Sequence, residues 1–273
     1  MWGATSPDGV RWTVLPGPLV IHFSDTTNVV YFDLRLQRYV WYARCSAFGR
    51  RCIGRAETDD WYTNSKTVYP STVDQHLMFP ALYHHRDDTS ELRLFSSSDG
   101  IIWSEAPGPP ALSPAPKDSW DAGCVFGGTD LIPLGTGRVA LPYGGYRYPH
   151  KYPRNRHTFS HDLGYAVWPA ERLAGIEAEQ EGSFMTLRMV AKGRRLRLNA
   201  RIEKAGYILV EAADRTGHPL PGHNFAEAIP MLGDSPNHRV TWRTGEKLNL
   251  DPARPFILRF RFRAAKLFAF ELD

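Results

Sequence analysis

The segment Ser6-Pro7-Asp8-Gly9-Val10-Arg11-Trp12 has a near copy 91 residues further on, Ser98-Asp99-Gly100-Ile101-Ile102-Trp103. Each is a polar turn closed by Gly, and a Trp stands three residues beyond that Gly. An Asp side chain can cap its own turn, Gly tolerates positive φ, and a Trp can fill the groove between neighbouring sheets. The pair therefore predicts one type of hairpin repeated along the chain; two unrelated hairpins that share a common turn are the alternative.

The spacing of the tryptophans indicates the size of the repeat. A degenerate copy occupies residues 57–61, so tryptophans stand at 12, 61 and 103, which are 49 and 42 residues apart. That is about the size of one four-stranded propeller blade. Five blades of about 45 residues need roughly 225 residues, more than residues 1–170 provide. We therefore expect an incomplete five-bladed β-propeller, either N-terminally truncated or completed by another chain, which would make a homo-oligomer.

Composition places the chain among all-β proteins. Of its 273 residues, 42% are hydrophobic and 23% are charged, which is ordinary for a globular protein and excludes disordered or fibrous classes. The 23 Gly and 21 Pro, with 12% aromatic residues, favour short strands joined by tight turns. No basic segment followed by an apolar run opens the chain, and no stretch approaches the ~20 apolar residues of a membrane span. We expect no export signal and no membrane partner; the chain as written is cytoplasmic, and its localisation is otherwise open.

Charge and cysteine content exclude further classes. The net charge of +4 and pI near 9.0 would suit an anionic ligand. Basic residues alternate along the chain, however, as at residues 259, 261 and 263, which is typical of the wet face of a sheet. We therefore expect no nucleic-acid partner. Cys45 and Cys52 flank a predicted hairpin turn and could face each other, but in a reducing compartment we expect them and Cys124 to be free thiols.

The first part of the chain contains recognisable strand pairs. Residues 28–32 and 39–43 are rich in β-branched and aromatic side chains and are joined by a charged turn. Residues 77–83 and 92–96 have the same character and predict two more strands. The Pro-rich segment 107–116 cannot supply ladder donors, so we expect a surface connection there.

The last part of the chain predicts a separate domain. From residue 182 the apolar and polar residues alternate regularly, which predicts about seven strands of an antiparallel β-sandwich. We expect the domains to be residues 1–170 for the propeller blades, 171–181 for an acidic, Ala-rich connector, and 182–273 for the sandwich. The expected core face of the sandwich is the alternating set Phe256, Leu258, Phe260, Phe262, Phe268 and Phe270.

Several segments resemble those of the furanosidase-type five-bladed propellers. They are residues 24–30 with 39–42, residues 55–61, Asp118-Ser119-Trp120-Asp121-Ala122-Gly123, and Tyr143-Gly144-Gly145-Tyr146. The relatives are glycoside hydrolase families 32, 43 and 130, above all the uncharacterised proteins similar to the N-terminal domain of family 32. The resemblance spans nearly the whole chain and implies a protein that binds sugars in the axial funnel of the propeller.

The same resemblance implies a set of carboxylates from the innermost strands of successive blades. The matching positions are Asp25 and Asp121, with Asp74 or Tyr69 from the blade between them. Asp25 and Asp121 would form the acid/base pair, and Asp74 would position it or tune its pKa. The acid Glu of the inverting relatives has no clear counterpart here. Asp25 precedes a strand, so capping of its own turn is the alternative role for that residue.

The residues themselves add candidates for sugar contact. Trp120 stands beside Asp121, ahead of two small residues, and places an aromatic platform next to an acid. The loop at residues 144–162 concentrates aromatic and cationic side chains, which could hold an anionic sugar, although a solvated loop is the alternative. The predicted substrate-binding residues are Trp120, Tyr69, Tyr146, His150, Arg156 and His157.

Together these features predict a glycosidase that hydrolyses an oligo- or polysaccharide with paired carboxylates. The alternative is a non-catalytic carbohydrate-binding or assembly protein, a relic or truncated propeller. No transition-metal spacing is found and no cofactor is expected, while a structural Ca²⁺ at the propeller axis is left open.

Overall fold

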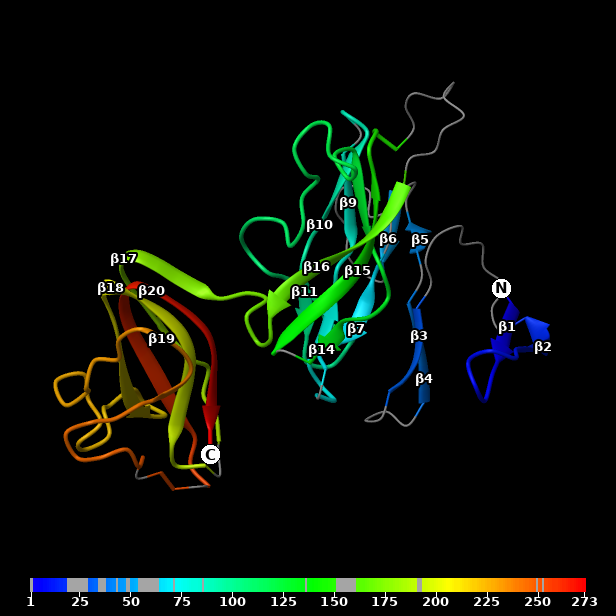
Figure 1. Cartoon of the computed structure of the whole chain (residues 1–273). Helices are drawn as coiled ribbons and strands as arrows, with labels where there is room; N and C mark the ends of the chain where they lie inside the picture. The colour runs from blue at the N-terminus through cyan, green and yellow to red at the C-terminus, as the bar shows by residue number, and fades with distance from the viewer. Residues whose placement is uncertain are drawn as a thin grey trace. The chain divides into compact units, whose positions relative to one another are not determined.

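The computed structural model describes residues 2–18, 29–33, 38–42, 44–47, 50–53, 64–70, 72–84, 86–135, 137–150, 161–190, 193–248, 250–251 and 253–273. Every regular element in these ranges is a β-strand, which confirms the all-β class (Figure 1). The described residues include no helix long and apolar enough to cross a membrane. The chain divides into two compact units, Met1–Trp168 and Pro169–Asp273.

The strands of the first unit are short. They are β1 (Trp2–Thr5), β2 (Thr13–Pro18), β3 (Val29–Asp33), β4 (Arg38–Tyr42), β5 (Arg44–Ala47), β6 (Arg50–Ile53), β7 (Lys66–Val68), β8 (His76–Met78), β9 (Ala81–His84), β10 (Thr89–Leu92), β11 (Phe95–Ser97), β12 (Ser104–Glu105), β13 (Cys124–Gly127), β14 (Ile132–Leu134), β15 (Arg138–Tyr146) and β16 (His161–Pro169). The second unit has longer strands, β17 (Ile176–Met185), β18 (Leu196–Asp214), β19 (Asp234–Arg239) and β20 (Phe256–Leu272).

The early hairpins follow the sequence pattern. β3 and β4 pair antiparallel, with Val30 opposite Trp41. The ends of both strands lie one residue from the predicted limits. β5 and β6 also pair antiparallel, and their register places Cys45 opposite Cys52, as the sequence suggested. β1 and β2 form a third hairpin, with a register shift between Trp2 and Ala4. Period-2 apolar patterns interrupted by turn residues thus predicted local pairing well here.

The predicted strands at residues 77–83 and 92–96 are each broken in the middle, which corrects the prediction. β8 and β11 lie in the sheet ordered β12-β11-β8-β7, whereas β9 and β10 lie in the sheet ordered β14-β15-β13-β10-β9, to which β16 adds by pairing with β15 (Figure 1). Pro80 stands at the first break and has no N–H for a ladder. Its carbonyl accepts the N–H of Arg93, at the second break, at 3.0 Å. Each predicted strand is therefore divided at the same level, and its two halves belong to different sheets.

The two Asp-Gly turns share four hydrogen bonds. In each, one Asp Oδ1 accepts from a Ser hydroxyl two residues earlier and from the N–H groups two and three residues later, at 3.0, 2.9 and 2.8 Å for Asp8 and 2.9, 2.8 and 2.9 Å for Asp99. The next Gly has φ of 72° or 70°, and its carbonyl accepts from the Trp Nε1 at 3.2 Å in both. The serines are Ser6 and Ser97, so the shared motif is Ser-x-Asp-Gly-x-x-Trp. The copy at residues 57–61 lies outside the described residues.

The two tryptophans differ in what they contact. Trp103 is half-buried and edge-on to Tyr42 and His76, with ring centroids 5.9 and 6.4 Å apart. It packs against the buried pair Met78 and Phe95. Trp12, in contrast, is 63% exposed. The turn is therefore formed by its own residues, whereas the packing of its Trp depends on the surrounding structure.

Buried hydroxyls tie β13 to its neighbours. The Ser90 hydroxyl, on β10, donates to the Val125 carbonyl at 2.9 Å and accepts the Val125 N–H at 3.1 Å, where β10 and β13 run parallel. The Ser65 hydroxyl donates to the Gly127 carbonyl at 2.7 Å. A Cβ at Gly127 would lie 2.7 Å from Ser65 Oγ, so this approach requires Gly. These bonds fix the strand that follows the Asp121 turn.

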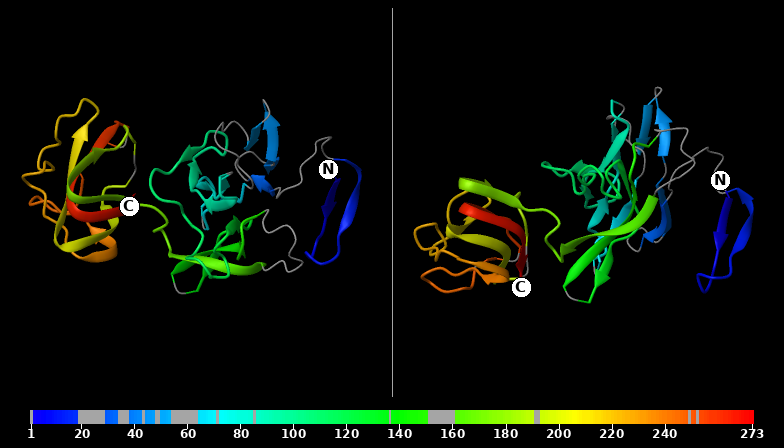
Figure 2. Two further views of the ribbon diagram at one scale, coloured as in Figure 1. Left: turned by 90° about the horizontal axis from the view of Figure 1, so that it is seen from above. Right: turned by 45° about the horizontal axis from the view of Figure 1, so that its top comes forward.

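The second unit is one antiparallel sheet ordered β17-β20-β18-β19 (Figure 2). The described part of the unit has four strands instead of the seven or so expected, because β18 and β20 are long and stay paired across register shifts. Within the segment 171–181, which the sequence analysis expects to be a connector, β17 begins at Ile176 and pairs with β20. Residues 240–242 form no regular strand: Trp242 forms isolated bridges with Ala228 and Gly245.

The face of β20 that is buried in the core changes near the middle of the strand. Phe256, Leu258, Phe260 and Phe262 are buried, as predicted, but beyond them the buried residues are Ala265 and Leu267. Phe270 is 37% exposed, so its predicted place in the core is wrong, and Phe268 is only partly buried. The cause is Ala264, whose φ of 42° lies in the left-handed region next to a register shift. One extra residue in a strand exchanges the two faces.

The core of the second unit draws on the sheet and on the segment between β19 and β20. Trp242 is 2% exposed, and its Nε1 donates to the Val210 carbonyl at 2.9 Å. The buried set is Leu196, Leu198, Ala200, Ile202, Ile208, Val210, Ala212, Met231, Val240, Trp242, Leu248, Leu250, Phe256, Leu258, Phe260, Phe262, Ala265 and Leu267. All of these residues belong to the second unit, which therefore has a core of its own.

Candidate functional site

Asp121 is buried and held by a phenol. It lies in the turn before β13 and is 6% exposed. The Tyr143 hydroxyl, on β15, donates to Asp121 Oδ2 at 2.8 Å. β13 and β15 are neighbours in the sheet, with Gly127 opposite Tyr143. Sheet pairing thus brings together an acid and a phenol that are 22 residues apart in sequence.

Trp120 packs the Asp121 turn onto the sheet. Its ring stacks on Tyr143, with centroids 5.4 Å apart and planes 28° apart. Two glycines make room for the indole: a Cβ at Gly145 would lie 2.4 Å from Trp120 Cζ3, and a Cβ at Gly164 would lie 2.7 Å from its Cη2. Trp120 stays half-buried in this position. Trp120 and Asp121 therefore lie together, and Tyr143 covers part of the Trp120 ring that the sequence predicts to contact a sugar.

The environment of Tyr143 keeps it a hydrogen-bond donor. Burial raises the pKa of its hydroxyl to about 12, and the hydrogen bond to Asp121 acts in the same direction. The hydroxyl is therefore protonated at neutral pH and can hold Asp121 Oδ2 in place. Among the described residues Tyr143 is the only side chain that donates to this carboxylate. The Oδ1 atom of Asp121 accepts no hydrogen bond from a described side chain.

Tyr146 and His150 belong to a second cluster, on the opposite face of β15. Side chains alternate along a strand, so Tyr146 points away from the face that carries Tyr143. Tyr146 stacks on His161 at 5.5 Å and meets Phe126 edge-on at 5.6 Å; Phe126 in turn lies 5.5 Å from His150. We call Tyr83, Phe126, Tyr146, His150 and His161 the aromatic cluster. The predicted substrate-binding residues are thus divided between two faces of one sheet.

Two other predicted site residues, Tyr69 and Asp74, lie near β7. Tyr69 follows β7, is 9% exposed, and its N–H donates to the Gln75 carbonyl at 2.9 Å. Asp74 is exposed in the turn between β7 and β8. Asp25, Arg156 and His157 lie outside the described residues.

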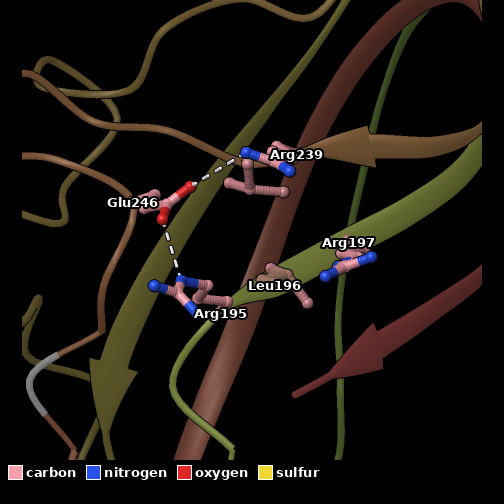
Figure 3. Close-up of a pocket in the computed structure, with 6 residues that line it drawn as sticks. Arg195, Leu196, Arg197, Arg239 and Glu246 are labelled. Atoms are coloured by element: carbon pink, nitrogen blue, oxygen red, sulfur yellow. Dashed lines mark hydrogen bonds and ion pairs between the residues drawn. The ribbon is translucent and has the colours of Figure 1, made fainter.

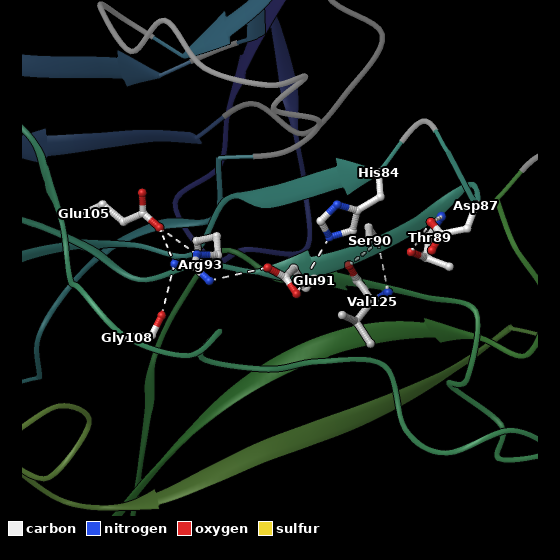
Figure 4. Close-up of polar contacts among 9 residues, drawn as sticks. All are labelled: His84, Asp87, Thr89, Ser90, Glu91, Arg93, Glu105, Gly108 and Val125. Carbon is white, nitrogen blue, oxygen red and sulfur yellow. Dashed lines mark hydrogen bonds and ion pairs between the residues drawn. The ribbon is translucent and has the colours of Figure 1, made fainter.

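A row of alternating charges was not anticipated from the sequence. Arg93 Nε donates to Glu105 Oε1 at 2.6 Å, and Arg93 Nη1 lies 3.4 Å from Glu91 Oε1 (Figure 4). His84 Nε2 lies 3.7 Å from Glu91 Oε2. Arg93 also donates to the Gly108 carbonyl at 3.2 Å. The spacing of Glu91 and Arg93, two residues apart, was the available signal. Because one guanidinium holds both carboxylates and the backbone, we interpret this row as structural.

Two observations bear on cofactor and thiol chemistry. Within the described ranges, no group of three or more His, Cys, Asp or Glu side chains is arranged to hold a metal ion. Cys124 is a buried free thiol whose Sγ donates to the Asp88 carbonyl at 3.3 Å. Burial raises the pKa of Cys124 to about 11, so the thiol is a poor nucleophile at neutral pH.

Comparison with known proteins gives only distant likenesses. No family model matches the chain, and no curated protein matches it significantly. One similar solved structure is a glycoside hydrolase family 43 arabinoxylan arabinofuranohydrolase from Bacillus subtilis in complex with cellotetraose, with 10% identity, a TM-score of 0.34, and coverage of 100% of this chain and 73% of that chain. Another is an exo-β-1,3-galactanase from Phanerochaete chrysosporium with β-1,3-galactotriose, with 12% identity, a TM-score of 0.24, and coverage of 98% and 88%.

Proposed function

We propose that this chain is a glycoside hydrolase-like protein that binds an oligo- or polysaccharide and hydrolyses its O-glycosyl bonds. The proposed architecture is an incomplete five-bladed β-propeller in residues 1–170, followed by a C-terminal β-sandwich in which the sheet β17-β20-β18-β19 is one layer. The repeated Ser-x-Asp-Gly-x-x-Trp hairpin and the short-stranded sheets of the first unit support this proposal. So do the segments that resemble the furanosidase-type propellers.

The observation that carries the proposal is the geometry at Asp121. Its carboxylate is buried, is held at 2.8 Å by Tyr143, and lies beside the stacked ring of Trp120. In glycoside hydrolysis one carboxyl group protonates the leaving oxygen, while a second activates water or attacks the anomeric carbon. A carboxylate fixed through one oxygen can present the other in a constant direction. Asp121 is therefore proposed as one member of the acid/base pair.

The proposed partner of Asp121 is Asp25, and Asp74 is proposed to position this pair or to tune its pKa. Hydrolysis consumes one water, whose hydroxyl group joins the anomeric carbon while its proton balances the one given to the leaving oxygen. A separation of about 6.5–9.5 Å between the two carboxyl groups would make the enzyme inverting, and about 5–5.5 Å would make it retaining. Asp25 lies outside the described residues, so this separation is the quantity to measure.

A second candidate function is non-catalytic sugar binding at the aromatic cluster. The specific observation is that Tyr146 stacks on the exposed His161 and lies on the face opposite Asp121. Aromatic rings bind the C–H faces of sugars, and His and Arg side chains bind their polar groups. In this case Tyr146 and His150, with Arg156 and His157, would bind the glycan, and Asp121 would stabilise the fold.

The substitution Asp121→Asn separates the two functions. Asn keeps the size of the side chain and can still accept from Tyr143, but it cannot give or take a proton. With plant, algal and microbial polysaccharides as probes, we expect release of reducing ends to fall by about 100-fold or more. We expect the dissociation constant for the same polysaccharide to change by less than about threefold.

The matched control is Asp87→Asn, because Asp87 is an exposed aspartate of the same unit that bonds only to Thr89 among the described residues. It should leave turnover unchanged. Unchanged turnover in Asp121→Asn would remove Asp121 from the mechanism. No turnover in the wild type, with binding lost in Tyr146→Ala, would establish the second function instead.

A further inference from the structure

An arginine-lined pocket lies in the second unit, which contains none of the site residues named so far. The pocket has a volume of about 190 Å³ (Figure 3). Its lining residues are Arg195, Leu196, Arg197, Arg239, Val240 and Glu246. Three of the six side chains are cations and one is an anion, so the pocket is mainly basic.

The strand register places like charges opposite one another. Arg197 on β18 is the direct antiparallel partner of Arg239 on β19. Arg195 precedes Arg197 by two residues and so lies on the same face. Leu196 and Val240, at 1% and 2% exposed, belong to the core on the other face. Like charges directly opposite each other destabilise a sheet, so this face is stabilised by any anion that binds it.

Among the described side chains, two carboxylates pair with these three arginines. Glu246 is shared, because Arg195 Nε donates to its Oε1 at 2.8 Å while Arg239 Nη1 lies 4.0 Å from its Oε2. Figure 3 shows both arginines directed at this one carboxylate. Arg197 pairs with Asp273 at 2.6 Å. Arg239 is therefore the least neutralised: its side chain is 71% exposed, and 4.0 Å is its closest ion pair among the described residues.

Arg259 in the same unit shows what a fully engaged arginine looks like. Its Nη1 donates to the buried Glu211 Oε1 at 3.0 Å, and its Nη2 donates to the Gly217 carbonyl at 2.9 Å. Glu211 also accepts the Phe225 N–H at 3.1 Å. Arg259 thus has a structural role that Arg239 lacks, and the difference marks Arg239 as available to a ligand.

We propose that this pocket binds the anionic group of an acidic saccharide, either the carboxylate of a uronic acid or a sulfate ester. Guanidinium groups form paired hydrogen bonds with both oxyanions, and three arginines line this one small pocket. The pocket is small enough to take the charged group and part of one ring, with the rest of the glycan in solvent. The inference rests on the proposed glycan-binding function and adds the class of glycan, held by the second unit.

The test compares three trisaccharides by isothermal titration calorimetry on the full chain: trigalacturonate, a sulfated galactose trisaccharide and a neutral galactose trisaccharide. The expected result is binding of an acidic probe at least tenfold tighter than of the neutral one, and the preferred acid tells carboxylate from sulfate. Arg239→Gln should weaken that binding about tenfold, the scale of one charge-assisted hydrogen-bond pair. Arg239→Lys should bind the acidic probe more tightly than Arg239→Gln but less tightly than the wild type. Lysine keeps the positive charge but lacks the planar pair of N–H donors of a guanidinium.

The matched control is Arg254→Gln, which removes the same charge from a side chain of this unit that is 84% exposed and outside the pocket. It should leave binding unchanged. Equal weakening by Arg239→Gln and Arg254→Gln would overturn the pocket in favour of net charge alone. Equal affinity for acidic and neutral probes would overturn it as well, and so would inorganic sulfate binding as tightly as any saccharide, which means an adventitious ion only.

The test also separates failure of this inference from failure of the proposed function. Asp121→Asn should retain the affinity for the acidic trisaccharide, because Asp121 belongs to the first unit. Loss of that affinity in Asp121→Asn with full affinity in Arg239→Gln would overturn the pocket and leave the proposed site in the first unit. Absence of turnover with any polysaccharide, with the Arg239 effect intact, would overturn hydrolysis and leave the pocket.

Discussion

At the scale of single residues, the hydrogen bond between Tyr143 and Asp121 gives a direct test of the site. Tyr143→Phe removes one hydroxyl and leaves a buried carboxylate without its donor among the described residues. We expect it to lower the free energy of unfolding of the first unit by about 2 kcal/mol, the cost of losing a hydrogen bond to a charged group. Chemical denaturation followed by tryptophan fluorescence measures this. Tyr165→Phe is the control, because Tyr165 is 64% exposed, and equal losses in the two variants would contradict the assigned role.

The same tyrosine predicts a pH dependence. The folded state raises the pKa of Tyr143 to about 12, above the value of about 10 in an unfolded chain. An acid whose pKa is raised on folding holds its proton more tightly in the folded state. Its contribution to stability is therefore complete below about pH 10 and is lost as the pH rises toward 12. Unfolding measured between pH 9 and pH 12 should show a steeper loss in the wild type than in Tyr143→Phe; parallel curves would refute the raised pKa.

At the residue scale the sequence indicates which side chains are neighbours along the chain but not which residues they meet across a sheet. Trp120 and Asp121 attract notice because an aromatic ring, an acid and two small residues are adjacent in the sequence. Tyr143 does not, since only the pairing of β13 with β15 brings it to Asp121. For the same reason the alternation along β15, which sends Tyr143 and Tyr146 to opposite faces, could not be used before the strand was known.

At the scale of elements, the two Ser-x-Asp-Gly-x-x-Trp hairpins form an internal control. Their turns share four hydrogen bonds, but Trp103 is half-buried against Tyr42 and His76, whereas Trp12 is 63% exposed. Trp103→Ala should therefore lower the free energy of unfolding by about 2–3 kcal/mol, less than a fully buried Trp would cost. Trp12→Ala should cost under about 1 kcal/mol. Equal costs would mean that Trp12 is buried in solution.

The element scale also shows why the pattern of β20 misled. A run of alternating Phe residues predicts one continuous core face, and that holds from Phe256 to Phe262. The register shift at Ala264 then exchanges the faces, so that Phe270 becomes exposed. Alanine carries no signal for a bulge; the shift is required by pairing with β17 and β18, both of which have register shifts of their own. Turns coded by Asp and Gly were predictable, and a bulge set by neighbouring strands was not.

At the scale of the whole molecule, the buried residues of the second unit predict that it folds alone. Its apolar core consists of residues from Leu196 to Leu267, and none comes from the first unit. The strand that the sequence assigned to a connector, β17, closes the sheet on β20, so a fragment must include it. We expect residues 169–273 expressed alone to unfold cooperatively, with the near-ultraviolet circular dichroism of a fixed Trp242. A fragment starting at residue 186, which lacks β17, should expose the β20 edge and the ring of Phe260, on which Phe184 stacks at 4.6 Å, and should lose several kcal/mol or aggregate. If both fragments were equally unstable while the full chain folded, the second unit would depend on the first for its core.

If the longer fragment folds, the arginine pocket can be titrated without the first unit, because all its lining residues lie within 195–246.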